Sequence, residues 1–251
     1  AILEPLQREH VLSYLIAGSE RAMLIDTGTG GQSMRALVAL LTDLPVFVLN
    51  SHSHWDHVGS NHEFDDIAIH VAEAHELAYR YAPEEIAEFF GEDSLLGPLP
   101  PGRSLETIGI GPSAPTTILQ GGERLDLGGR SLTAVHTPGH APGLLSLLDE
   151  ENGVLFSTDT AYPGPLYAFS DETDIPTYIR SMELLADLAP SLRYIHPSHN
   201  ADLMPVSLLP RMRDALIDIQ QGKAPDRVDE TKATYEYEGF GVYAPLPVEQ
   251  P

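Results

Sequence analysis

The stretch that decides the fold is rich in metal-binding side chains and reads, from residue 51, Ser51-His52-Ser53-His54-Trp55-Asp56-His57. It follows an apolar run at 46–50 that predicts a buried strand. Imidazole and carboxylate are the ligands that divalent transition metals prefer where no thiolate is present. Their spacing suits a loop leaving a strand better than a helical pair four residues apart. We therefore expect a metal site here rather than a histidine-rich surface turn.

The chain of 251 residues can hold one large α/β domain or two small ones. Its 37 acidic and 14 basic residues give a net charge of −23. Such a field opposes binding to nucleic acid and to anionic membranes. It also disfavours a strongly anionic substrate in the absence of a local basic pocket.

The chain has no cysteine, which excludes disulfides, a thiol nucleophile and thiolate metal ligands. No apolar run approaches the roughly 20 residues that span a bilayer. No signal peptide is recognisable, so we expect a cytoplasmic location. The first residue is Ala1, which is compatible with a removed leader.

Strand-like and helix-like patterns alternate along the whole sequence. Helices are expected at 32–41, 73–91 (interrupted by Pro83, which suits the first turn of a second helix), 175–188 and 206–221. Strands are expected at 11–16, 22–25, 46–50, 67–71, 117–119, 124–127, 131–137, 144–148, 154–157, 193–196 and 233–243. This alternation predicts one α/β domain over residues 1–251, with helices outside two sheets and a lid insertion around 73–115.

Three downstream segments repeat the arrangement of a ligand just after a strand. They place His140, Asp159 and His199 beyond predicted strand ends, where α/β sheets gather their active sites. A single histidine after a strand is usually structural. The ordered set, with the cluster at 52–57, is specific.

These residues, together with Asp26-Thr27-Gly28, resemble the metallo-β-lactamase superfamily, and within it the branch of glyoxalase II and acyl-homoserine-lactone lactonases. The resemblance implies a four-layer αβ/βα sandwich with a dinuclear metal centre along one edge. It assigns His52, His54 and His140 to the first metal. It assigns Asp56, His57 and His199 to the second, with Asp159 bridging both.

The resemblance leaves two points open. Asp26 either lies beside the metal centre or is only a turn-forming residue. Two divalent ions are expected, zinc first, although iron, manganese and cobalt also suit nitrogen and oxygen ligands.

Such a centre predicts hydrolysis of a lactone, ester or thioester carbonyl by metal-bound hydroxide. Asp56 and Tyr162 are the candidate catalytic residues. Tyr162 follows Asp159 by three positions, as in several lactonases, and is expected to donate a hydrogen bond to the substrate carbonyl. The alternative for Tyr162 is a packed side chain at a loop edge.

Other reactions of the family are less well matched. A β-lactam hydrolase is the main alternative, but zinc β-lactamases have cysteine or serine where Asp159 stands. Glutathione thioester hydrolases use a basic C-terminal extension, whereas the tail from residue 222 has only the basic residues Lys223, Arg227 and Lys232. Diiron oxidoreductases of this family carry a flavodoxin domain, for which the chain has no room. Thr158 and Ser198 depart from the family pattern, which has glycine at both positions.

Two apolar segments are expected to shape the pocket for a small-molecule substrate with an apolar or acyl portion. The first is a lid at 79–99, with Tyr81, Phe89, Phe90, Leu95 and Leu96; the second is a facing wall at 163–169, with Leu166, Tyr167 and Phe169. The alternatives are core packing and a subunit contact, and an apolar lid is compatible with a homodimer. The remaining histidines are expected to be non-ligands, with His136 and His196 as candidates for orienting a ligand.

Overall fold

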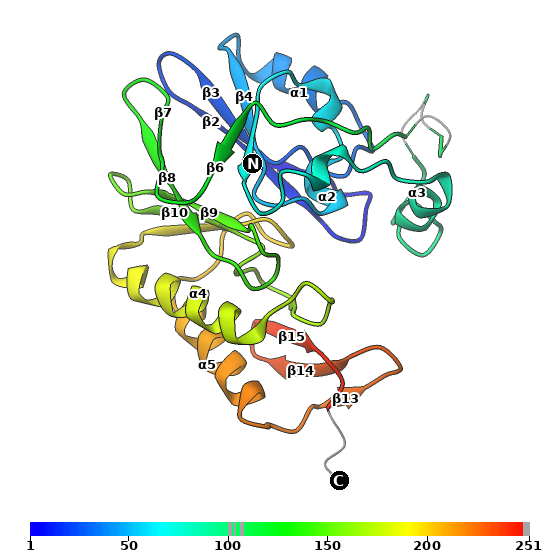
Figure 1. Cartoon of the computed structure of the whole chain (residues 1–251), viewed down its shortest axis with the longest axis vertical. Coiled ribbons are helices and arrows are strands. Elements are labelled where there is room, and N and C mark those ends of the chain that lie inside the picture. Colours follow the sequence, from blue (N-terminus) through cyan, green and yellow to red (C-terminus); the bar gives the residue numbers. More distant parts are fainter. Residues whose placement is uncertain (100–101, 103, 106–107, 248–251) are drawn as a thin grey trace. The chain divides into compact units, whose positions relative to one another are not determined.

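The computed structural model describes residues 1–99, 102, 104–105 and 108–247, and the chain divides into two compact units. Unit 1 is Ala1–Ala134 and unit 2 is Val135–Pro251. Both contain strands and helices (Figure 1), so the predicted α/β class is confirmed. The prediction of one domain with a lid insertion at 73–115 stays a prediction, and residues 100, 101, 103, 106 and 107 of that insertion lie outside the described residues.

Unit 1 is built on a sheet in the order β1-β2-β3-β4-β5-β6. Its strands are β1 (Ile2–Leu3), β2 (Leu12–Ala17), β3 (Ala22–Ile25), β4 (Val46–Leu49), β5 (Ile67–His70) and β6 (Thr117–Leu119). The first three pair antiparallel, and the strands from β3 to β6 pair parallel. Each residue of β3 is buried, as expected for an apolar run with strands on both sides.

Short helices complete unit 1. They are α1 (Met34–Leu41), α2 (Trp55–Val58), η1 (Asn61–Glu63), η2 (Glu76–Ala78) and α3 (Pro83–Phe89). Helix α1 begins where the Ser33 hydroxyl accepts a hydrogen bond from the Ala36 N–H at 3.1 Å. Its buried residues, Met34 and Val38, pack with strand residues in the core of the unit. A hairpin of β7 (Arg124–Asp126) and β8 (Ser131–His136) follows, and β8 runs across the division between the units.

Unit 2 contains β9 (Leu145–Asp149), β10 (Val154–Thr158) and β12 (Tyr194–Pro197), with β10 antiparallel to β9 and parallel to β12. A further sheet has the order β11-β15-β14-β13, with β11 (Pro165–Tyr167), β13 (Arg227–Val228), β14 (Ala233–Tyr237) and β15 (Phe240–Ala244). Helices α4 (Ile175–Leu188) and α5 (Leu208–Gln220) pack side by side (Figure 1), and η3 (Ala189–Ser191) follows α4. Their apolar faces share one core with these strands.

The structure corrects the sequence-based elements at a few points. Residues 73–91 were expected to be helical, but they form only η2 and α3, with Pro83 starting α3 as predicted. Ala82 is extended, as expected for a residue directly before a proline, and this separates α3 from the segment before it. The second half of the cluster at 52–57, expected as a loop, forms α2. The strand-like run at 233–243 forms a hairpin of two strands, β14 and β15.

Within the described part of the chain, no helix is both long enough and apolar enough to cross a membrane.

Candidate metal centre

Parallel pairing brings Asp26 and Ser51 together at one edge of the unit 1 sheet. Ile25 at the end of β3 pairs with Leu49 at the end of β4, so the residues that follow both strands emerge side by side. The Ser51 backbone N–H donates to Asp26 Oδ1 at 2.7 Å. Asp26 adopts a φ of +60°, in the left-handed region that short polar side chains tolerate best after glycine. This resolves the question left open above, because Asp26 holds the start of the metal motif, residues 52–57.

The four predicted ligands of unit 1 converge. The His52 ring lies 4.4 Å from the His54 ring and 4.2 Å from the His57 ring, measured between centroids. His57 Nε2 lies 3.6 Å from Asp56 Oδ2. His52 and His57 are fully buried and Asp56 is nearly so. Helix α2 turns Asp56 and His57 back toward the strand end, which gives unit 1 a compact half-site of three imidazoles and one carboxylate.

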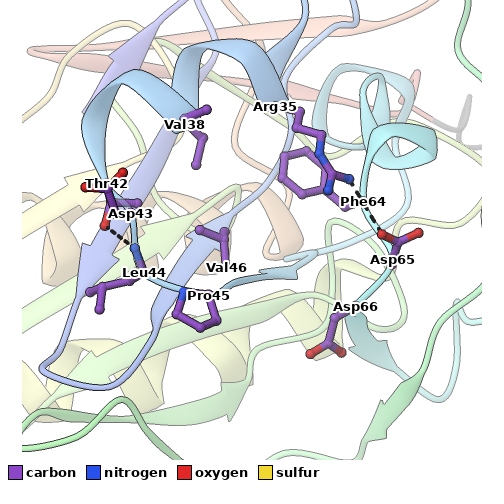
Figure 2. Close-up of a pocket in the computed structure, with 11 residues that line it drawn as sticks. Arg35, Val38, Thr42, Asp43, Leu44, Pro45, Val46, Phe64, Asp65 and Asp66 are labelled. Atoms are coloured by element: carbon purple, nitrogen blue, oxygen red, sulfur yellow. Dashed lines mark hydrogen bonds and ion pairs between the residues drawn. The ribbon is translucent and has the colours of Figure 1, made fainter.

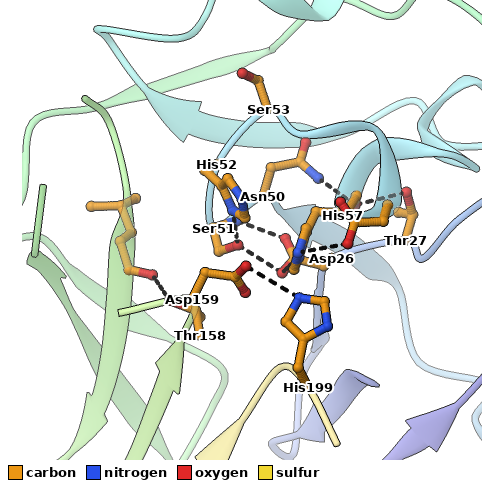
Figure 3. A network of polar contacts seen from close by, with 12 residues as sticks. Asp26, Thr27, Asn50, Ser51, His52, Ser53, His57, Thr158, Asp159 and His199 are labelled. Atoms are coloured by element: carbon orange, nitrogen blue, oxygen red, sulfur yellow. Dashed lines mark hydrogen bonds and ion pairs between the residues drawn. The ribbon is translucent and has the colours of Figure 1, made fainter. Parts of the chain in front are cut away.

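Hydrogen bonds fix the tautomers of two of these histidines (Figure 3). Asp26 Oδ2 accepts from His57 Nδ1 at 2.9 Å and from the Ser51 hydroxyl at 2.7 Å. Since the Ser51 hydroxyl hydrogen goes to Asp26, its oxygen accepts from His52 Nδ1, 2.9 Å away. Both histidines therefore carry the lone pair on Nε2, as metal-ligating imidazoles do when a carboxylate or hydroxyl orients them.

Two supporting residues were not recognised from the sequence. Glu73 is buried and accepts the Ser53 backbone N–H at 2.6 Å, which ties the metal motif to the segment after β5. Asn61 exchanges amide hydrogen bonds with Asn50 at 2.8 and 3.1 Å. A lone glutamate or asparagine carries no periodic signal, so only the tertiary contacts reveal these roles.

Unit 2 contributes a second half-site around Asp159. Thr158 at the end of β10 pairs with Pro197 at the end of β12, so Asp159 and His199 emerge at the same edge. His199 Nε2 lies 3.1 Å from Asp159 Oδ2 (Figure 3), and His140 Nε2 lies 3.7 Å from the same oxygen. The three ligands predicted for this half of the chain therefore meet at one carboxylate oxygen.

The loop that carries His140 is held firmly. Gly139 has a φ of +137°, and a Cβ there would lie 2.3 Å from the Tyr178 Cα on α4, so only glycine fits. His140 Nδ1 lies 2.8 Å from the Tyr167 carbonyl oxygen, which can only accept. His140 therefore also carries its lone pair on Nε2.

Tyr162 is placed differently from the sequence-based expectation. Its hydroxyl donates to the Pro165 carbonyl at 2.9 Å and accepts the Tyr167 N–H at 3.1 Å. The side chain is buried, and burial, reinforced by the charge of Asp159, raises its pKa well above the ordinary value. Donation to a substrate would require the bond to Pro165 to break. In this geometry Tyr162 fixes the backbone N–H of Tyr167, and the backbone carbonyl of the same residue holds His140.

Thr158, where the family has glycine, adopts a φ of +48°. This conformation is strained for a β-branched residue. The Thr158 hydroxyl donates to the Leu145 carbonyl at 2.9 Å, which compensates part of the cost. Thr158 therefore keeps the left-handed backbone conformation for which glycine is the usual residue. Ser198, the other departure, is buried.

His136 and His196, considered as orienting residues, bind backbone carbonyls instead. His136 Nε2 lies 2.9 Å from the Pro142 oxygen and His196 Nδ1 lies 2.6 Å from the Asp202 oxygen. The His196 ring also stacks on Phe156, with centroids 5.2 Å apart. These contacts give both residues structural roles beside the ligand loops.

The predicted lid packs on the metal motif. Phe89 stacks on Trp55 with ring centroids 4.2 Å apart and planes 3° from parallel, and Phe90 is buried with its ring 5.9 Å from Trp55. In the predicted wall, Leu166 is buried in the core of unit 2, whereas Tyr167 is exposed. The aromatic residues of the predicted lid are thus partly core residues. Leu166 of the predicted wall is a core residue only.

Two further features of unit 1 lie outside the predicted site residues. Glu4 accepts hydrogen bonds from the Thr29 N–H at 2.9 Å and from its hydroxyl at 2.5 Å, and burial raises the Glu4 pKa. A pocket beside α1 (Figure 2) is lined by apolar side chains, an Arg35–Asp65 ion pair of 3.6 Å and other acids. It contains none of the predicted ligands.

The donor chemistry fits divalent metal ions. All seven predicted ligands belong to groups of histidine and aspartate side chains that could hold a metal ion. Each of His52, His57 and His140 has Nδ1 engaged by a hydrogen-bonding partner, which leaves Nε2 as the donor nitrogen. Two carboxylates and five imidazoles are a chemically suitable set for such cations.

Comparisons with known proteins identify the family. Residues 6–216 match the model of the metallo-β-lactamase superfamily. The human acyl-coenzyme A thioesterase MBLAC2 is 33% identical over 187 residues, which are 70% of this chain and 67% of the human protein. The crystal structure of the BLEG-1 B3 metallo-β-lactamase has a TM-score of 0.62 at 21% identity, covering 86% of this chain and 98% of that one. TTHA1623 in a di-iron-bound form has a TM-score of 0.60 at 23% identity, covering 84% and 98%.

These likenesses confirm the fold predicted from the cluster at 52–57 and its downstream partners. The chain belongs to the metallo-β-lactamase superfamily and is a hydrolase.

Proposed function

We propose that this chain is an acyl-thioester hydrolase that works with a dinuclear metal centre. The observation that carries the proposal is its 33% identity to the human acyl-coenzyme A thioesterase MBLAC2, over 70% of this chain. Thioester hydrolysis is one of the three reactions that the sequence predicts, and esters and lactones are the other two.

The proposed centre uses all seven predicted ligands. His52, His54 and His140 would hold the first metal, and Asp56, His57 and His199 the second. Asp159 would bridge them: its Oδ2 lies near Nε2 of both His140 and His199, which are assigned to different metals. When bound, the two metals supply hydroxide at neutral pH and polarise the carbonyl of the substrate.

The protein's own residues prepare this chemistry. Asp26 and the Tyr167 carbonyl keep Nδ1 of His57 and His140 protonated, so that Nε2 is the ligand atom. The burial of Asp56 and Asp159 excludes water and strengthens their interaction with a cation. These features support a site assembled before substrate arrives.

A small pocket of about 30 Å³ in unit 1, with room for about one water molecule, lies near the metal motif. It is lined by Leu6, Phe90, Leu95 and Leu99 together with polar residues near Glu4. Phe90 links this pocket to the metal motif through Trp55. The net charge of −23 opposes an anionic carrier such as coenzyme A, so we expect the acyl portion to be the main recognised group.

We further propose zinc as the metal. The all-nitrogen and oxygen ligand set equally accommodates iron, which the related TTHA1623 structure contains. Elemental analysis of protein purified without added metal would identify the ion, and two equivalents per chain are expected.

A substrate panel on protein of known metal content tests the function. It contains an acyl-coenzyme A, an uncharged acyl thioester, an oxoester with the same acyl group, an acyl lactone and a chromogenic cephalosporin. The highest kcat/KM is expected for a thioester. Dominant turnover of the lactone or the cephalosporin would contradict the proposal and assign the chain to the lactonase or β-lactamase activity of its family.

A further inference from the structure

Tyr81 is fixed beside the metal motif by packed aromatic rings of unit 1. Its ring meets Phe89 edge to face at 5.6 Å and 72°, and Phe89 in turn stacks on Trp55. Trp55 stands between the ligands His54 and Asp56 in the sequence. Because Tyr81 packs on Phe89 and Phe89 packs on Trp55, these contacts fix the position of Tyr81 relative to the metal motif.

The Tyr81 hydroxyl differs from two other phenols of the chain, those of Tyr79 and Tyr162, in its hydrogen bonding. Within the described residues it makes no hydrogen bond, whereas Tyr79 donates to Glu85 at 3.1 Å and Tyr162 donates to Pro165 at 2.9 Å. Tyr81 is only partly exposed. A phenol in such a position, with its donor hydrogen unused, is suited to bind a ligand group.

The electrostatic environment keeps this phenol protonated. Burial raises the pKa of Tyr81, and the negative charge of Asp56 raises it further. At neutral pH the Tyr81 phenol therefore keeps its hydrogen and remains a hydrogen-bond donor.

We propose that Tyr81 is a catalytic residue that donates a hydrogen bond to the substrate carbonyl oxygen as negative charge develops on it. The inference rests on the proposed function and assigns to Tyr81 the donor role that the sequence suggested for Tyr162. A single donor of this kind contributes roughly 10²- to 10³-fold to kcat. No proton is transferred, so the phenol is unchanged after each turnover.

The test compares Tyr81→Phe with Tyr79→Phe. Both variants lose only a hydroxyl and keep the ring, and Tyr79, half exposed and bonded to Glu85, is the matched control from the same segment. Each is assayed on a thioester and an oxoester with the same acyl group, with metal content and thermal unfolding measured in parallel. Tyr81→Phe is expected to lower kcat about 10²-fold on both substrates, with KM, metal content and unfolding temperature near wild type. Tyr79→Phe should match wild type.

Several results would overturn the inference. Unchanged kcat in Tyr81→Phe would show that the hydroxyl is a bystander, and a loss of bound metal would show a structural role. A loss confined to the oxoester would move the hydrogen bond from the carbonyl to the leaving oxygen. If wild type prefers a lactone or a β-lactam, the proposed function fails, and the same variants tested on that substrate still decide the role of Tyr81.

Discussion

Asp26 Oδ2 accepts hydrogen bonds from both Ser51 Oγ and His57 Nδ1, at 2.7 and 2.9 Å. Through Ser51 it also orients His52. One buried carboxylate, 26 residues before the first predicted ligand, thus sets the donor nitrogen of two histidines predicted to bind metal.

We predict that Asp26→Asn weakens metal binding by about 10- to 100-fold, the usual cost of losing a partner that orients a ligand. Asparagine tolerates the positive φ of this position, so the backbone should persist. However, its amide nitrogen cannot accept the His57 N–H. Competition with a chromophoric chelator measures the affinity, and thermal unfolding of the metal-free protein is the control. An unchanged affinity in a folded variant would refute the orienting role.

Asp159→Ala should reduce metal content below two per chain and largely abolish turnover. The reason is that one carboxylate would serve both metals, and without it their mutual repulsion is not offset. Elemental analysis and steady-state kinetics measure the two effects. Asp171→Ala, on an exposed turn, is the matched control. Full activity with two bound metals would exclude the bridging assignment.

Tyr162→Phe is expected to destabilise the protein by about 1–3 kcal/mol, because it removes a buried hydroxyl and leaves the partly buried Tyr167 N–H without its acceptor. The shifted Tyr167 peptide should also loosen His140, so a modest fall in turnover accompanies the lower stability. Urea unfolding and kinetics measure these effects. A large fall in kcat at wild-type stability would instead return the electrophilic role to Tyr162.

At Thr158 a glycine variant should be more stable than an alanine variant, which is the reverse of the usual order of stability. Both substitutions lose the hydroxyl bond to Leu145, but alanine retains the cost of about 1–2 kcal/mol for a left-handed conformation. Thr158→Gly should therefore be more stable than Thr158→Ala by about 1 kcal/mol in urea unfolding. The same pair at Ser157, which has no positive φ, should show the ordinary order. Equal stability of the two Thr158 variants would mean that the strain is relieved.

Glu4 gives a pH-dependent prediction. Burial raises its folded-state pKa above 4.5, so the folded state holds the proton more tightly than the unfolded state does. The contribution of Glu4 is therefore most favourable below pH 4.5 and is lost as the pH rises through the folded-state pKa. The glutamine in Glu4→Gln cannot ionise. In metal-free protein, the unfolding temperature of this variant should therefore rise relative to that of wild type as the pH increases from 4 to 8. A pH-independent difference between Glu4→Gln and wild type would contradict this assignment.

The sequence predicted the ligand residues because metal chemistry and strand-end placement are both local. His52, His54, Asp56 and His57 are close in the chain, and the runs before Asp159 and His199 are apolar enough to mark strands. Parallel pairing then places such residues at one edge of a sheet, as found at Asp26 with Ser51 and at Asp159 with His199. Fold class and family follow from that pattern.

Roles that depend on distant contacts could not be read in this way. Glu73, Asn61 and the Tyr167 carbonyl act through backbone or amide groups that many residues could supply. The spacing of Tyr162 from Asp159 suggested that its hydroxyl could donate a hydrogen bond to substrate. Only the folded chain shows that this hydroxyl donates to the Pro165 carbonyl instead.

What the sequence determined by itself is thus the α/β scaffold and a predicted set of metal ligands, because both depend on residue type and short-range periodicity. What the tertiary structure decided is which groups orient those ligands and which phenol retains a donor hydrogen. Hydrogen-bond partners are chosen by proximity in the folded chain, and proximity between residues such as Asp26 and His57 exists only after folding.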